Sequence, residues 1–315
     1  MPATALALVL AAALLHAGWN LWMKRAGTAG GLTFVWGTTV VAALCFAPLA
    51  WLVGAFGAAP DTAGVASPAI AAGAAPAIAR LADWPAATWF AVAVSVLVHT
   101  AYFRVLQRGY EAGDLSVVYP VARGTGPLLA SIAAILWLGE PAGPASLAGL
   151  VAVVVGTFTI AGGGAILRAG GSPLVRRGLA WGLATGVLIA AYTVNDGRAV
   201  SVLGAHPLVY YWTICLAQAL LLAPWVIGRV PGWAALLARS WRVVLGVGVL
   251  SPLSYLLVLE AMRLAPISVV APARELSMLV AALAGSILLR EGQLPRRLAG
   301  SALIATGVAL LASAR

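Results

Sequence analysis

The sequence predicts an all-α polytopic membrane protein with ten transmembrane helices in two inverted five-helix repeats. Three observations lead to this prediction: the composition, the number of long apolar runs and an internal repeat. Hydrophobic residues make up 62% of the 315 residues and charged residues 9%, and the mean hydropathy is +1.00. Soluble domains average about 45–50% apolar and about 25% charged residues. The composition therefore excludes a soluble globular domain, a disordered tail and a nucleic-acid-binding protein.

Ten apolar runs are long enough to cross a bilayer. A helix needs about 20 residues to span ~30 Å of hydrocarbon, and helices satisfy every backbone polar group inside such runs. The spans predicted in the first half are Thr4–Met23, Leu32–Phe56, Pro85–Gln107, Leu115–Leu138 and Ser146–Gly163. Those predicted in the second half are Gly178–Asn195, Pro207–Gly228, Trp241–Met262, Ile267–Leu289 and Arg297–Ala312.

The spans group into a first unit at residues 1–164, a linker at 165–177 and a second unit at 178–315. Residues 57–84 are a low-complexity stretch rich in Ala, Pro and Gly. Because its prolines disfavour a continuous helix, we expect a flexible external or interfacial loop there.

The two halves contain similar motifs. The segment LSVVYPVAR ending at Arg123 matches ISVVAPAR ending at Arg274, and each arginine precedes a glutamate by 17 residues, Glu140 or Glu291. The later glycines also match, Gly149 with Gly300 and Gly156 with Gly307. Five spans per unit give the second unit the opposite orientation, an arrangement typical of secondary transporters with a site near the midplane. A duplication retained only for packing is the alternative.

The basic residues predict the orientation. Most of the net charge of +10 comes from loops on one face, at Lys24, Arg25, Arg104, Arg108, Arg168, Arg176, Arg177, Arg229, Arg239, Arg242, Arg290, Arg296 and Arg297. The other face carries Arg80, Arg198, Arg263 and Arg315. The positive-inside rule makes the first face cytoplasmic and puts both termini outside. We expect an integral protein of a bacterial cytoplasmic (inner) membrane, in contact with lipid.

Two arginines lie inside spans rather than in loops. Arg123 is about 12 Å deep at 1.5 Å per residue, and Arg274 occupies the matching place in the ninth span. A charge at that depth is costly unless it is paired or hydrated. The guanidinium group suits a carboxylate or phosphate ligand, so both residues are candidates for binding an anionic group; clamping backbone carbonyls or a glutamate is the alternative.

Glu275 is read as the only carboxylate deep inside a span. It is a candidate for proton coupling, because burial raises the pKa of a carboxyl group, or for a fixed ion pair with Arg123. Prolines in the same two helices, Pro120 and Pro272 among them, free backbone carbonyls near the arginines.

Other polar and small residues fit either a cavity or helix packing. Asn20 and Tyr192 are candidate cavity residues, with interhelical hydrogen bonds as the alternative. Gly178, Gly182 and Gly186 form a double GxxxG motif that fits close packing within the chain or a homodimer. The sequence contains no CxxC motif and no His/Cys cluster that would suggest a metal site. We expect no cofactor.

These motifs resemble the EamA-type transporters of the drug/metabolite transporter superfamily. The resemblance covers nearly the whole chain and rests on Trp19-Asn20 with Lys24, the Ser-Val-Val-x-Pro cores, the Leu-Gly-Glu140 and Arg-Glu291 ends, and Leu-Ala-Gly with a glycine seven residues later. It implies ten helices around a central cavity. By position it implies a cavity lined by Trp19, Asn20, His99, Tyr119, Arg123, Tyr192, Tyr255 and Arg274.

The function predicted from these features is secondary transport of a small metabolite, such as an amino acid or organic acid, bearing an anionic group. The two halves would alternate access, with export driven by protons or another gradient, because no nucleotide-binding motif is present. An intramembrane enzyme would need a nucleophile–base set or an HExxH metal site, and neither is recognised. We therefore expect no enzyme; a passive channel or an intramembrane enzyme is the alternative.

Overall fold

A computed structural model of the chain describes residues 1–26, 31–56, 78–113, 115–161, 172–280 and 294–313. The helices of the first half are α1 (Ala3–Ala26), α2 (Leu32–Phe56), α4 (Ala86–Ala112), α5 (Leu115–Leu138) and α6 (Pro144–Ala161). Those of the second half are α8 (Pro173–Ser201), α9 (Pro207–Arg229), α10 (Trp233–Arg239), α11 (Trp241–Leu264), α12 (Ile267–Ala273) and α14 (Leu294–Ser313). A short 3-10 helix, η1 (Leu81–Asp83), precedes α4.

The structure is all-α, as predicted, and contains helices of membrane-spanning length. Within its described part, seven helices are long and apolar enough to cross a bilayer, and α6 is a shorter apolar helix. Residues 281–289 of the predicted ninth span lie outside the described residues. The count of ten spans and the two inverted repeats therefore stay predictions.

Several helix ends differ from the predicted spans. α4 continues to Ala112 and α8 to Ser201, beyond the last apolar residues of each run. α8 also begins at Pro173, inside the stretch predicted as a linker. The extra turns at the ends of α4 and α8 carry polar residues with partners in the protein, such as Glu111, which pairs with Arg108, and Asp196, which accepts from Tyr255. Hydropathy alone therefore ends both helices too early. The short helix α10 was not predicted.

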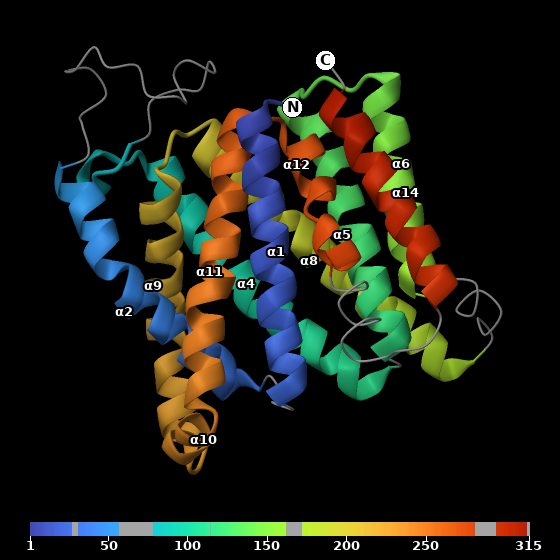
Figure 1. Cartoon of the computed structure of the whole chain (residues 1–315). Helices are drawn as coiled ribbons and strands as arrows, with labels where there is room; N and C mark the ends of the chain where they lie inside the picture. The colour runs from blue at the N-terminus through green and yellow to red at the C-terminus, as the bar shows by residue number, and fades with distance from the viewer. Residues whose placement is uncertain (27–30, 57–77, 114, 162–171, 281–293, 314–315) are drawn as a thin grey trace.

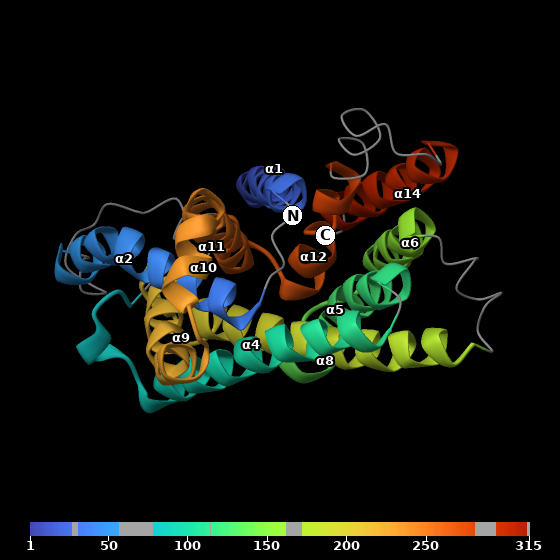
Figure 2. The same ribbon diagram turned by 90° about the horizontal axis from the view of Figure 1, so that it is seen from below.

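The helices pack in pairs (Figures 1 and 2). The most extensive contacts join α1 with α11, α4 with α8, α2 with α9, α5 with α8, and α6 with α14. If α1 corresponds to α8 and α4 to α11, the first two pairs exchange with each other. The pairs α2–α9 and α6–α14 then map onto themselves. These four pairs fit the two-fold relation predicted between the halves, which stays a prediction.

The glycines of α6 and α14 show the same reciprocity. A Cβ on Gly149 would lie 2.7 Å from the Gly307 carbonyl oxygen, and one on Gly307 would lie 2.7 Å from the Gly149 oxygen. Gly156 and Gly300 approach each other's carbonyl oxygens at the same distance. The two helices run antiparallel and touch backbone to backbone, which only glycine permits.

The glycine motif of α8 packs within the chain. A Cβ on Gly182 would meet Val121 of α5, and one on Gly186 would meet Thr125 of the same helix. A Cβ on Gly113 would lie 2.7 Å from the Gly178 Cα. Of the two packing alternatives left open by the sequence, the structure uses this face for α5.

The end of the predicted 57–84 loop is ordered. Residues 57–77 lie outside the described residues. Ile78 pairs with the α8–α9 connection, where its N–H donates to the Gly204 carbonyl (2.6 Å) and its carbonyl accepts from the His206 N–H (3.1 Å). Trp84 is buried and donates its indole N–H to the Ile78 carbonyl (2.9 Å).

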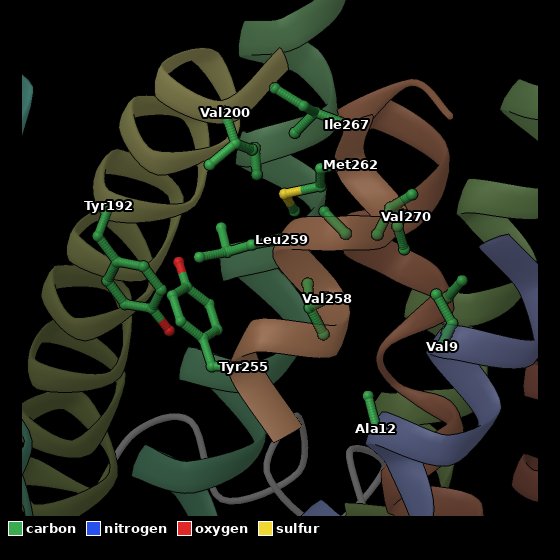
Figure 3. Packing of buried hydrophobic residues seen from close by; sticks show 14 of the residues in the cluster. Val9, Ala12, Tyr192, Val200, Tyr255, Val258, Leu259, Met262, Ile267 and Val270 are labelled. Carbon is green, nitrogen blue, oxygen red and sulfur yellow. The ribbon is translucent and has the colours of Figure 1, made fainter. Parts of the chain in front are cut away.

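Both ends of the chain lie on one side of the bundle (Figure 1). The Met1 amino group donates to the Ala312 carbonyl at 2.7 Å. The same side contains much of the main hydrophobic core, where Val9, Val258, Leu259, Met262 and Val270 are buried together (Figure 3).

Candidate functional site

A cavity of about 130 Å³ lies in the centre of the bundle. Residues from α1, α4, α5, α8, α9 and α11 line it, together with two residues that follow α12, and six of them are candidates from the sequence: Trp19, His99, Arg123, Tyr192, Tyr255 and Arg274. A second hollow of about 300 Å³, here called the vestibule, shares Trp19, His99 and Arg123 with the cavity.

The vestibule extends the cavity away from the chain termini. It is lined by Asn20 and Met23 at the end of α1, by Gln107 and Tyr110 near the end of α4, and by Tyr119 of α5. On the opposite side of the cavity lies the buried cluster shown in Figure 3, in which Val258 and Leu259 are almost inaccessible. The hollow therefore leads toward the face where α1 and α4 end, which is the predicted cytoplasmic face.

Arg123 forms a buried ion pair with Glu275. Its Nε lies 3.3 Å from Glu275 Oε2, and the two side chains are 13% and 2% exposed. Arg123 Nη2 also donates to Ser277 Oγ at 3.0 Å. The pair links α5 to the segment after α12. Of the two alternatives given for Glu275 from the sequence, the structure contains the ion pair with Arg123.

Arg274 lies at a break in its helix. α12 ends at Ala273, and helical residues resume at 276. Pro272 has no N–H to continue the helical ladder, and Ser277 N–H donates to the Arg274 carbonyl at 3.1 Å. At this break the two adjacent side chains have different partners. Glu275 pairs with Arg123, whereas Arg274 contacts Tyr255.

Among the described residues, the groups that contact the Arg274 guanidinium are neutral. Its Cζ lies 5.5 Å from the centre of the Tyr255 ring, and Nη1 lies 3.4 Å from Thr193 Oγ1. In the described part of the chain, no ion pair joins Arg274 to a carboxylate, unlike Arg123. Arg274 is thus a cation at a cavity wall that an incoming anion can pair with.

Asp196 is a second carboxylate inside a span, so the expectation that Glu275 is the only one is wrong. Asp196 is fully buried in α8. It accepts hydrogen bonds from Tyr255 OH (2.8 Å), Tyr210 OH (3.0 Å) and Asn195 Nδ2 (3.2 Å). The predicted sixth span ended at Asn195, one residue too early to include it. The carboxylate holds Tyr255 in place beneath Arg274.

Aromatic side chains form much of the cavity wall. His99 stacks on Tyr192 with ring centres 4.2 Å apart, and Tyr255 meets both rings edge-on at 6.0 Å. Tyr211 lies 4.8 Å from Tyr255, and Tyr102 lies 5.8 Å from Tyr192. The side chains of Tyr192 and Tyr255 point toward one another in Figure 3.

Trp19 and its neighbours complete the wall on the α1 side. Trp19 meets His16 edge-on at 4.9 Å, and its buried indole N–H has no acceptor among the residues that the structure describes. Asn20 donates to the His16 carbonyl at 2.7 Å, within its own helix. Every sequence candidate therefore borders the cavity or the vestibule except Glu275, which contacts them through Arg123; their role in binding stays a prediction.

Glu140 has a local role that the sequence did not indicate. Its carboxylate accepts from the Ile267 and Ser268 N–H groups at 2.7 Å each, the first residues of α12. It thereby caps the helix that leads to Arg274.

No group of three or more His, Cys, Asp or Glu side chains that could hold a metal occurs among the described residues. Cys215 is buried at the vestibule, whereas Cys45 is exposed.

Comparison with known proteins relates the chain to transporters. Residues 176–313 match the EamA-like transporter family. A solved structure titled "Crystal structure of protein" is similar with a TM-score of 0.71 and 18% identity, covering 98% of this chain and 96% of that one. A search of the curated proteins found no match. The family match over the second half confirms the sequence-based resemblance to EamA-type transporters. The solved structure shows that its fold is similar to that of this chain over 98% of the length.

Proposed function

Taking the EamA-like match as the premise, we propose that this protein is a secondary transporter that moves a small metabolite bearing an anionic group by alternating access. The family match indicates a membrane transporter. The nature of the solute is our own inference from the cavity. We also propose that the protein resides in the bacterial cytoplasmic membrane with both termini outside, as the basic loops predict.

The observation that carries the proposal is the charge of Arg274. It borders the cavity and has a tyrosine ring and a hydroxyl as neighbours, whereas Arg123 is neutralised by Glu275. A desolvated guanidinium attracts a carboxylate or phosphate strongly because its forked N–H groups match their oxygens. In the proposed cycle, the solute's anionic group binds Arg274.

The asymmetry of the hollow fits one state of such a cycle. The vestibule leads to the predicted cytoplasmic face, and the cluster around Val258 and Leu259 closes the other side. Rocking of the two halves would separate this cluster and close the vestibule. In the proposed direction, the solute enters from the cytoplasm and leaves outside, driven by protons or another gradient.

The proposal is tested in proteoliposomes. A panel of radiolabelled organic acids, amino acids and phosphonates is screened for uptake that saturates and that unlabelled solute competes away. Arg274→Gln is expected to lower the affinity of the transported solute by about tenfold or more, the value of a charge-assisted hydrogen bond. Arg239→Gln, at the end of α10 away from the cavity, is the matched control and should leave transport unchanged.

Two results would contradict the proposal. Flux that rises linearly with solute concentration would indicate a channel rather than a carrier. Unchanged affinity in Arg274→Gln would exclude this arginine as the anion ligand.

A further inference from the structure

We propose that the cavity selects an aromatic monocarboxylate, that is, an acid with an aromatic ring that carries no ammonium group. This inference rests on the proposed function and narrows its solute class. It follows from three properties of the wall: its aromatic rings, its hydrogen-bond donors and its lack of carboxylates.

The rings set the shape of the solute. His99, Tyr102, Tyr192, Tyr211 and Tyr255 come from four helices, and their ring centres are 4.2 to 6.5 Å apart along a connected chain of contacts. Aromatic rings favour offset or edge-on contact with a further ring. The cavity volume of about 130 Å³ suits one six-membered ring, since an apolar cavity of about 150 Å³ holds benzene.

The donors set the charge of the solute. Arg274 supplies a guanidinium without a carboxylate partner in the described part of the chain, and Trp19 supplies a buried indole N–H without an acceptor. Both border the same cavity. A buried donor left without a partner is unfavourable, and a carboxylate has oxygens for two donors at once.

The absence of carboxylates among the described lining residues disfavours an ammonium group on the solute. None of the described residues lining the cavity or the vestibule is Asp or Glu. Glu275 is engaged by Arg123, and Asp196 lies behind Tyr255 with three donors of its own. An α-ammonium group would thus enter a site that holds two arginines and would find no anion to pair with. This distinguishes an aromatic acid from an aromatic amino acid.

Four matched probes test each property on the purified full-length protein. Isothermal titration calorimetry in detergent compares 3-phenylpropanoate with three analogues. 3-Cyclohexylpropanoate has a saturated ring in place of the aromatic one, 3-phenylpropanamide lacks the charge, and phenylalanine adds the ammonium group. We expect 3-phenylpropanoate to bind, with the cyclohexyl analogue about threefold or more weaker from lost ring contacts. The amide and phenylalanine should each bind more weakly than 3-phenylpropanoate, by a factor of about ten or more.

Arg274→Gln should lose the preference for 3-phenylpropanoate over the amide, while Arg239→Gln should retain it. Equal binding of the phenyl and cyclohexyl acids would overturn the aromatic selectivity, and equal or tighter binding of phenylalanine would overturn the exclusion of ammonium. Absence of binding by all four probes would overturn the inference as a whole. In each case, saturable and Arg274-dependent flux of another anionic solute would leave the proposed function standing.

Discussion

At the scale of single residues, two arginines that the sequence repeat makes equivalent have different surroundings. Arg123 lies in the continuous helix α5 and is neutralised at 3.3 Å by Glu275, whereas Arg274 lies at a helix break and faces a tyrosine ring. The repeat contains a glutamate next to Arg274 only; at the matching place, Gly124 follows Arg123. One carboxylate between two cations can neutralise one of them, and the geometry selects Arg123.

Breaking the ion pair between Arg123 and Glu275 should destabilise the protein. Glu275→Gln leaves Arg123 as a buried uncompensated charge, so the free energy of unfolding should fall by about 3–5 kcal/mol. Arg123→Gln should cost a similar amount, but the double variant should cost less than the two single changes together because both charges are then absent. Chemical unfolding of the four proteins in detergent measures this coupling. Strictly additive losses would contradict a fixed pair and would favour Glu275 as an independent proton-binding group.

Asp196 shows the limit of sequence reasoning about residues. Arg123, Arg274 and Glu275 could be recognised from the sequence as charges inside spans, because a charge stands out in an apolar run. Asp196 did not stand out, since it lies among Asn195, Gly197 and Arg198, a polar stretch that hydropathy places at a helix end. The helix continues because two tyrosines from other helices and a neighbouring asparagine satisfy the carboxylate. The two tyrosines lie 14 and 59 residues away in sequence, so no local pattern indicates them.

At the scale of elements, apolar helices were predictable and helix ends with tertiary partners were not. The predicted spans Leu32–Phe56 and Leu115–Leu138 coincide with α2 and α5, because both runs end where apolar residues end. α12 was predicted as the start of one long span, but it is a seven-residue helix followed by a break at Arg274. Pro272 predicted an interruption of this helix. The cap could not be predicted from the local sequence, because Glu140 lies more than 120 residues earlier in the chain.

The cap gives a prediction at this scale. Glu140→Ala removes both acceptors of the Ile267 and Ser268 N–H groups, so the free energy of unfolding should fall by about 0.5–2 kcal/mol. The affinity for 3-phenylpropanoate should fall as well, because α12 leads directly to Arg274. Glu111→Ala is the control, since Glu111 makes an exposed pair with Arg108 whose contribution is small. Thermal unfolding and calorimetry measure the two effects. Equal behaviour of the two variants would show that the cap does not position α12.

At the scale of the whole molecule, the two halves meet through contacts that map onto each other. The pairs α1–α11 and α4–α8 exchange, while α6 and α14 pair through glycines placed seven residues apart in each helix. A repeat inserted in opposite orientations brings equivalent helices together antiparallel. The motif match alone predicts a two-fold relation between the halves, and the reciprocal glycine approaches are the contacts that fit this prediction most specifically.

Substitution of these glycines tests the relation directly. Gly156→Ala and Gly300→Ala each place a methyl group 2.7 Å from the partner's carbonyl oxygen, and overpacking of this kind costs about 1–3 kcal/mol. Because the two contacts are reciprocal, we expect the two variants to lose similar free energies of unfolding, and Gly149→Ala and Gly307→Ala to form a second matched pair. Gly228→Ala in α9 is the control, since a Cβ there meets nothing within 4 Å. Chemical unfolding in detergent compares the five variants. A large loss in one member of a pair with none in the other would contradict a two-fold relation between the halves, because symmetry requires each glycine to be as necessary as its counterpart.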